Sequence, residues 1–229
     1  MRYALALSAI CGAVMAVSSA VSADIIEVRV FNLDFSAAPS GQPVTDAIIA
    51  PGDTIRWKWA GGLHDTTSVA GQPEQWQSPL QSTIGATYDH TFTTLGVSQY
   101  YCSVHGGDLG NGQATGMAGK ITVTKLNLDK PVPGTAGTNN TVSIHGANPG
   151  DVIDYYYAFK YGSTSVTGCT GLKLSLATAV KFGSRTANAN GDASLVAFVP
   201  AAIAGRTVVL QAVNKTQCTV STLEQYTFP

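Results

Sequence analysis

The sequence predicts an all-β protein made of two successive β-sandwiches. Only 12% of the 229 residues are charged, 45% are hydrophobic, and 24 are glycine. The charged fraction is low, and Thr, Ser, Ala and Val are abundant instead. This composition is typical of short strands joined by tight turns. No stretch keeps a 3.6-residue apolar period over three turns, and this absence argues against an α/β fold.

The N-terminal segment has the pattern of a secretory signal peptide. It begins with Arg2, continues in an apolar run from Ala4 to Val17, and ends in small residues at Ala23. The apolar run is shorter than the roughly 20 residues of a transmembrane helix. Residues 1–23 are therefore expected to be cleaved. The mature protein is expected to be secreted or periplasmic, with no membrane span.

The first sandwich is predicted over residues 24–127. Its candidate strands are rich in β-branched and aromatic residues and are separated by glycine and proline turns. Ile55, Trp57 and Trp59 alternate with basic residues, so they are expected on the buried face of one strand. The expected strands are Ile26–Phe31, Thr54–Trp59, Tyr88–Thr93, Ser98–Cys102 and Lys120–Lys125.

A linker is predicted over residues 128–140, because Pro, Gly, Thr and Asn dominate this stretch. Acids outnumber bases before it and bases outnumber acids after it, which supports two units. Residues 141–229 are expected to form a second small sandwich of immunoglobulin-like type. Its expected strands are Thr141–Ile144, Val152–Tyr157, Leu172–Leu176, Ser194–Val199 and Thr207–Val213.

Three cysteines remain after the predicted signal peptide. An odd number in an exported protein leaves one thiol outside any disulfide. Cys102 stands three residues before His105, whereas Cys169 and Cys218 lie in the second unit with no histidine nearby. Cys169 and Cys218 are therefore expected to form a disulfide, and Cys102 is expected to stay free.

The pair of Cys102 and His105 places a thiolate and an imidazole close together, which suits a soft or borderline metal such as copper or zinc. His64 follows a glycine pair at the end of a strand, and Met117 adds a thioether before the last strand of the unit. Two imidazoles, one thiolate and one weak thioether are the ligands of a trigonal copper site with a long axial bond. The sequence thus predicts one mononuclear copper ion.

These motifs resemble the blue copper cupredoxins of the plastocyanin type. The resemblance covers residues 24–127 and implies an eight-stranded Greek-key β-sandwich. It also implies that His64 is the first histidine ligand, Cys102 the thiolate, His105 the second histidine and Met117 the axial thioether. The segments that carry it are PGDTI at 51–55, LHDTTS at 63–68, YCSVH at 101–105 and GMAGKI at 116–121.

One departure from the family pattern is the long segment Gly106–Gly116 between His105 and Met117, where plastocyanin-like sequences have only a few residues. Gln113 lies inside it and is an alternative axial ligand through its side-chain oxygen. Met117 is preferred because the residues around it lead into the last strand as they do in the family. The glycine-rich segment is expected to be mobile unless the metal or the second unit pins it, and to help set the partner-docking surface.

Three further residues near the site or in the second unit have simpler expectations. Asp65 follows His64 and either supports the copper-binding segment by hydrogen bonding or is an ordinary surface acid. His90 is expected to serve in packing. His145, at a turn, shows no cysteine or carboxylate in a metal pattern, and no role is assigned to it.

The absence of several motifs excludes some classes of protein. Four histidines without a His-x-His pair exclude a multicopper enzyme, and no hydrolase or phosphate-binding motif is present, so no enzymatic activity is expected. A net charge of −1 excludes a polybasic nucleic-acid binder. The preferred function is electron transfer through one copper ion to a redox partner protein of unknown identity. The alternative is a cell-surface protein that stores or delivers copper and attaches through its second unit. The sequence does not define the oligomeric state.

Overall fold

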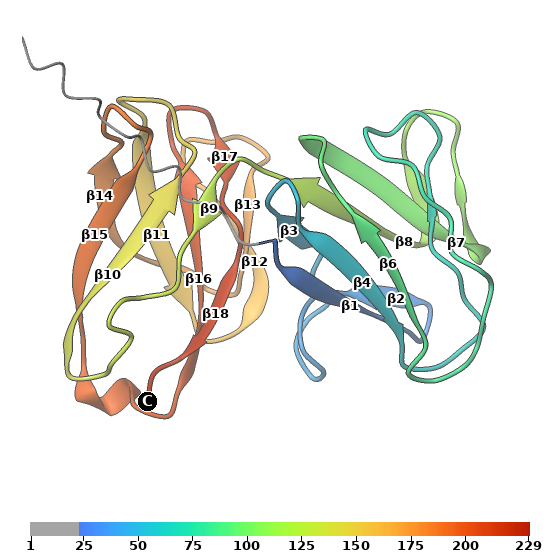
Figure 1. Ribbon diagram of the computed structural model, residues 1–229, viewed down its shortest axis with the longest axis horizontal. Coiled ribbons are helices and arrows are strands. Elements are labelled where there is room, and N and C mark those ends of the chain that lie inside the picture. Colours follow the sequence, from blue (N-terminus) through green and yellow to red (C-terminus); the bar gives the residue numbers. More distant parts are fainter. Residues whose placement is uncertain (1–22) are drawn as a thin grey trace, which may run out of the picture.

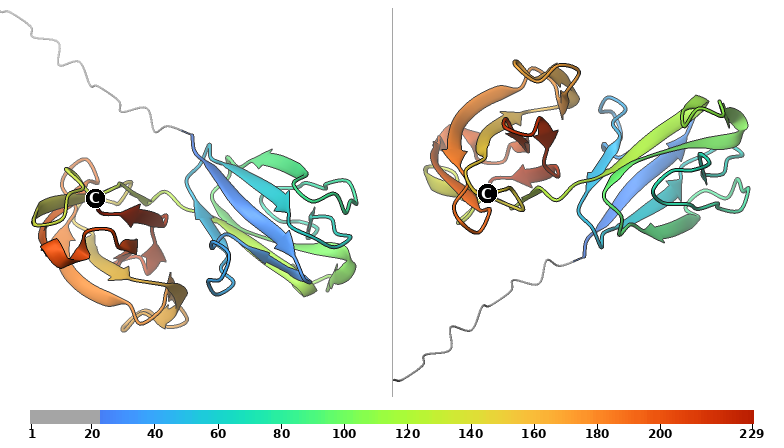
Figure 2. Two further views of the ribbon diagram at one scale, coloured as in Figure 1. Left: turned by 90° about the horizontal axis from the view of Figure 1, so that it is seen from below. Right: turned by 90° about the horizontal axis from the view of Figure 1, so that it is seen from above.

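The structure is a computed structural model that describes residues 23–229. The predicted signal peptide lies outside the described residues, except for Ala23. The described chain consists of strands and one short 3-10 helix, arranged as two β-sandwiches side by side (Figures 1 and 2). Within residues 23–229 no helix is long and apolar enough to cross a membrane. The prediction of an all-β protein is confirmed.

The first sandwich consists of two four-stranded sheets, in the orders β2-β1-β4-β6 and β3-β8-β7-β5. β1 runs parallel to β4, and β3 runs parallel to β8, because the chain crosses between the sheets before returning to pair. The strands are β1 (Ile25–Phe31), β2 (Asp34–Ser36), β3 (Ala47–Ile49), β4 (Thr54–Trp59), β5 (Thr67–Ser68), β6 (Thr87–Thr91), β7 (Gly96–Asp108) and β8 (Ala114–Val123).

The core of this sandwich is aromatic. Ile55, Trp57 and Trp59 are fully buried, as their alternation predicted. The Trp57 ring lies 5.4 Å from the ring of Trp76 and 5.6 Å from that of Tyr100, so side chains from both sheets meet around it. The first contact is stacked and the second is edge-on, and contacts of both kinds favour defined ring positions as well as burying area. Cys102 and Met117 belong to the same buried cluster as these rings.

The second sandwich packs a sheet of order β15-β10-β9 against a sheet of order β14-β11-β16-β17, with β18 also paired to β16. A separate hairpin, β12-β13, completes it. The elements are β9 (Asn127–Leu128), β10 (Thr138–His145), β11 (Val152–Ala158), β12 (Tyr161–Ser165), β13 (Lys173–Leu176), β14 (Val180–Thr186), β15 (Ala193–Val199), η1 (Ala201–Ile203), β16 (Thr207–Asn214), β17 (Thr219–Val220) and β18 (Glu224–Thr227).

The predicted disulfide is present. Cys169 and Cys218 are bonded, and they enclose a sequence separation of 49 residues. A loop of this length corresponds to about 4 kcal/mol of stabilisation in the chain-entropy account, as an upper figure. Cys102 is the one free cysteine among the described residues, and it is buried.

Residues 128–140, expected to form a linker, are folded onto the second sandwich. Leu128 is buried in its core, and β9 pairs with β10. The buried side chain of Asn140 accepts hydrogen bonds from Gly134 N and Thr135 N, which fixes the turn before β10. The chain therefore passes from one sandwich to the other before β9. The apolar side chain of Leu128 and the amide of Asn140 explain why the proline- and glycine-rich composition does not make this stretch a free connection.

Candidate metal centre

Two residues of the candidate metal centre lie where the regular pairing of β7 with β8 is interrupted. Tyr101 is paired with Ala118, but the next pair is Gly106 with Gly116. Four residues of β7, Cys102 to His105, therefore stand opposite the single residue Met117. Such an irregularity bends a strand and redirects its side chains. It allows Cys102 and His105, three residues apart, to face the same point.

His64 reaches this point from the connection between β4 and β5, which belong to different sheets. Two residues hold the His64 backbone. His64 and Gln81 exchange two backbone hydrogen bonds of 3.0 Å, and Trp59 Nε1 donates a hydrogen bond of 3.1 Å to the carbonyl oxygen of His64. Gly62 makes room for the imidazole, because a Cβ at that position would collide with His64 Nε2. Gly62 also has a φ of 83°, a conformation that favours glycine.

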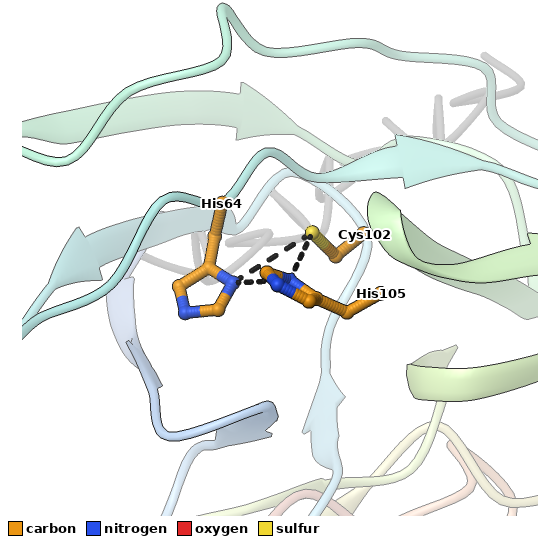
Figure 3. A group of neighbouring side chains, drawn as sticks. All are labelled: His64, Cys102 and His105. Atoms are coloured by element: carbon orange, nitrogen blue, oxygen red, sulfur yellow. Dashed lines mark hydrogen bonds between the residues drawn. The ribbon is translucent and has the colours of Figure 1, made fainter.

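The three predicted donors converge (Figure 3). The Nδ1 atoms of His64 and His105 lie 3.1 Å apart, and Cys102 Sγ lies 3.7 Å from the first and 3.5 Å from the second. Metal bonds of about 2.0–2.1 Å to nitrogen and 2.3 Å to sulfur let two donors on one ion lie up to about 4.4 Å apart. All three separations are compatible with a single ion, and the donor set fits copper.

Burial and charge favour the form of His64 that binds metal. Burial lowers the pKa of His64, the neighbouring His105 lowers it further, and the carboxylate of Asp65 acts in the opposite direction. The net shift is downward, so the ring is neutral at physiological pH. A neutral imidazole has the free lone pair that a metal ligand needs.

Asp65 is buried and joins the two ligand-bearing segments. Its Oδ1 accepts a hydrogen bond of 2.6 Å from Ser103 N, and its Oδ2 accepts one of 2.6 Å from Ser103 Oγ. Of the two expectations for Asp65, support of the metal-binding segment is therefore the one that the structure matches. Sequence reasoning did not single out Ser103, although its place directly after Cys102 was visible.

Met117 and Gln113, the two candidates for the axial position, lie in very different places. Met117 is buried in the same core cluster as Cys102 and stands opposite the ligand-bearing bulge. Gln113 is exposed at the far end of the β7-β8 hairpin, where its carbonyl accepts a hydrogen bond from Leu109 N. The Gln113 side chain is therefore separated from the donors by the paired part of the hairpin.

The segment Gly106–Gly116 differs from the mobile loop that its composition predicted. Its ends are paired strands that extend β7 and β8 as far as Asp108 and Ala114. The pairing is close at its base, where a Cβ on Gly106 would lie 2.5 Å from Thr115 O. Gly106 and Gly116, where a Cβ would lie 2.3 Å from His105 O, therefore permit close contact between the two strands.

Side-chain contacts hold the hairpin against the segment after β5. Asp108 Oδ2 accepts a hydrogen bond of 3.0 Å from Ala70 N, and Gln72 Nε2 donates one of 3.1 Å to Gly112 O. The hydrogen bonds from Ala70 and Gly110 lower the pKa of Asp108. The first sandwich itself thus anchors the hairpin.

The end of the molecule that carries the centre has an apolar surface. His105 is exposed, whereas His64 and Cys102 are buried. Leu63 and Val104, the immediate neighbours of the two histidines, expose about half of their surface, as does Leu80 beside the segment paired with His64. We call Leu63, Leu80 and Val104 the apolar rim. Of the three donor residues, His105 is the one that is exposed to solvent.

The other two histidines have different environments. His90 packs its ring 5.5 Å from that of Trp76 and 4.8 Å from that of Phe92, which agrees with the expected packing role. His145, to which the sequence assigned no role, lies between two carboxylates: Nδ1 lies 2.8 Å from Asp192 Oδ1, and Nε2 lies 2.9 Å from Asp129 Oδ2. Asp192 is distant in sequence and Asp129 fell within the predicted linker, so no local pattern revealed this triad.

No model of a known protein family matches the chain. Among solved structures, an oxidized variant of amicyanin is 22% identical, with a TM-score of 0.32 over 43% of this chain and 81% of its own. A reduced Cu(I) form of an amicyanin variant at pH 4 is 24% identical, with a TM-score of 0.33 over 46% and 86%. A further reduced variant is 22% identical, with a TM-score of 0.34 over 45% and 86%. Because these sequence identities and TM-scores are low, we argue the chemistry of the metal centre from its own residues alone.

Proposed function

We propose that the protein is an exported electron carrier with one type 1 copper ion held by His64, Cys102 and His105, and with Met117 as the weak axial ligand. The observation that carries the proposal is the convergence of two Nδ1 atoms and one Sγ atom within reach of a single ion. When bound, copper supplies one-electron redox chemistry, which the axial ligand and the surroundings of the thiolate tune.

The donor set favours copper over zinc. Structural zinc sites in proteins are tetrahedral and use four cysteine and histidine ligands, whereas this centre has two imidazoles, one thiolate and a nearby thioether. A soft thioether suits Cu(I), and a weak axial methionine is the usual fourth ligand of a His₂Cys copper site. The buried position of Met117 opposite the bulge supports this role, while Gln113 is exposed at the hairpin end.

A rigid centre suits electron transfer, because the donors then move little when the oxidation state changes. Asp65 ties the segment of Cys102 to that of His64 through Ser103, and Trp59 and Gln81 hold the His64 backbone. Cys102 itself is fully buried in the aromatic core, which shields its sulfur from solvent oxidants.

The exposed ring of His105 offers the route for electrons. Its edge lies at the protein surface beside the apolar rim, which a redox partner protein would cover on docking. The β7-β8 hairpin begins at this histidine and would set which partner fits. On this proposal the protein transforms no substrate of its own.

The alternative, a protein that stores or delivers copper, is less well supported. Rapid delivery requires that donors exchange readily with those of an acceptor, but His64 and Cys102 are each at most 2% exposed. The Cys169–Cys218 disulfide fits an oxidising compartment, which supports export from the cytosol.

The decisive experiment is to load the mature chain with Cu(II) and to record visible absorption and EPR spectra. The proposal predicts an intense thiolate-to-copper band and a narrow copper hyperfine splitting, both lost in Cys102→Ser. Retention of both signals in that variant would refute the ligand assignment. Fast, reversible redox cycling with slow copper loss to a chelator distinguishes a carrier from a delivery protein, for which the chelator would remove copper readily.

A further inference from the structure

The second sandwich contains a cavity of about 340 Å³ that the proposed electron transfer does not use. Residues of β10 and β15 line it on one side, and residues of β11, β14 and β16 line it on the other. Pro200, Ile203 and Phe228 also line it, so the cavity extends to the end of the sandwich that carries η1 and the C-terminus. Figure 1 shows these two elements at its lower left. The cavity volume falls in the range of small-molecule sites in proteins.

Five of the fourteen residues that line this cavity are aromatic, and all but one of the others are apolar. Tyr157 packs edge-on against Phe159, with ring centres 5.8 Å apart, and meets Phe182 at 6.0 Å in the same manner. Edge-on contacts of this kind favour defined ring positions. Phe159 and Phe198 remain 40% and 63% exposed, so the cavity opens to solvent beside them.

The polar side chains in the lining have little to offer a polar ligand. Asn140 is buried, and its amide is already hydrogen-bonded to the backbone of Gly134, Thr135 and Thr138. The hydroxyl of Tyr157 is the remaining polar side-chain group of the lining. The part of a ligand that enters the cavity must therefore be mainly apolar.

A cation stacks on Phe159, one of the two exposed rings beside which the cavity opens. The guanidinium carbon of Arg206 lies 4.1 Å from the ring centre of Phe159. Within residues 23–229, Arg206 has neither an ion pair nor a side-chain hydrogen bond. Stacking on an aromatic face leaves the in-plane N–H groups of a guanidinium free for a carboxylate. Apolar walls and a free cation at the rim together define an amphiphilic anion as the complementary ligand.

We propose that this cavity binds a medium-chain carboxylate, with the hydrocarbon tail between the two sheets and the carboxylate on Arg206. At about 30 Å³ for each water-sized group, the cavity volume of about 340 Å³ corresponds to a tail of about ten groups of that size. This inference is independent of the copper centre, since no residue of the cavity belongs to the first sandwich.

The test is calorimetric titration of the full mature chain with decanoate. We expect one saturable site in the wild type, about fivefold weaker binding in Arg206→Gln, and unchanged binding in the control Lys173→Gln, which removes an exposed charge elsewhere. Decanol, which has the same tail without the charge, should bind the wild type about as weakly as decanoate binds Arg206→Gln.

A second variant tests the location of the tail. Ala197 lines the cavity, and Ala197→Phe should fill it and abolish binding while the near-UV circular dichroism stays native. The absence of decanoate binding to the wild type would overturn the proposal, and so would unchanged binding in a folded Ala197→Phe. Equal affinity of the wild type and Arg206→Gln for decanoate would overturn the role of the cation.

Discussion

Asp65 holds Ser103 with both of its carboxylate oxygens, at 2.6 Å from the backbone nitrogen and 2.6 Å from the hydroxyl. This pair links the residue after one histidine donor to the residue after the cysteine donor. Asp65 belongs to the connection between β4 and β5 and Ser103 belongs to β7, so the Asp65–Ser103 pair is a direct polar link between two separate parts of the first sandwich.

Removal of this link should loosen the centre. Asp65→Ala removes the buried carboxylate that accepts both hydrogen bonds from Ser103, a residue that is itself exposed, and should cost about 1–2 kcal/mol of unfolding free energy. Asp65→Asn keeps one acceptor oxygen for Ser103 N and should cost less than half of that. Urea unfolding of the metal-free protein measures both values. Equal losses in the two variants would show that the oxygen bound to Ser103 N is unimportant.

Gly62 is predicted to be essential for the position of His64. Gly62→Ala combines an unfavourable positive φ with a collision against the imidazole, so it should weaken copper binding by at least tenfold. Gly85→Ala is the matched control, because Gly85 has a φ of 84° but open space around its Cβ position. It should cost about 1–2 kcal/mol of stability and leave copper affinity intact. Similar copper affinities in the two variants would contradict the steric role.

We predict that Met117, and not Gln113, is the axial ligand of the copper ion. Met117→Leu should change the reduction potential and the EPR spectrum of the copper-loaded protein, because the potential of such sites depends on the axial ligand. Gln113→Ala should change neither, since that side chain is exposed at the hairpin end. Cyclic voltammetry of both variants gives the answer, and a response confined to Gln113→Ala would reverse the assignment.

The β7-β8 hairpin is predicted to govern partner docking. A variant in which Gly107–Thr115 is shortened, with Met117 kept in register, should retain its copper spectrum but change its rate with the physiological partner. Stopped-flow reduction by that partner and by a small inorganic reductant separates the two effects. If both rates equal those of the wild type while the spectrum is unchanged, docking takes place elsewhere.

His145 should make the stability of the second sandwich depend on pH. Burial opposes protonation, but hydrogen bonds and charge from Asp192 and Asp129 outweigh it and raise the pKa of His145. The contribution is therefore complete below the unfolded pKa of about 6.5 and is lost as the pH rises through the folded pKa. It is small, because the site is partly exposed.

The measurement is urea unfolding at pH 6 and pH 9 for the wild type and His145→Gln. The wild type should lose more stability than the variant between these pH values. The comparison removes the contribution of Glu224, whose pKa burial raises to about 7 and which titrates in both proteins. Identical pH dependence in the two proteins would contradict the triad.

The sequence by itself determined the all-β class, the burial of Trp57 and Trp59, and the Cys169–Cys218 disulfide. These features follow from local patterns. The alternation of apolar and polar residues along one strand shows which face is buried. The histidine three residues after Cys102 marks this cysteine as a metal ligand and leaves the other two to form the disulfide. The sequence also named His64, Cys102 and His105, through residue types and spacing that suit a metal.

Only the tertiary structure decided how these residues meet. The register jump opposite Met117 depends on how β7 pairs with β8, and the position of His64 depends on how the two sheets pack. The glycines of residues 106–116 predicted mobility because their composition does not reveal strand pairing. Asp192 reaches His145 through the pairing of β10 with β15, a contact between residues far apart in the chain. Local spacing shows which donors are available, and the packing of sheets decides which of them share a point in space.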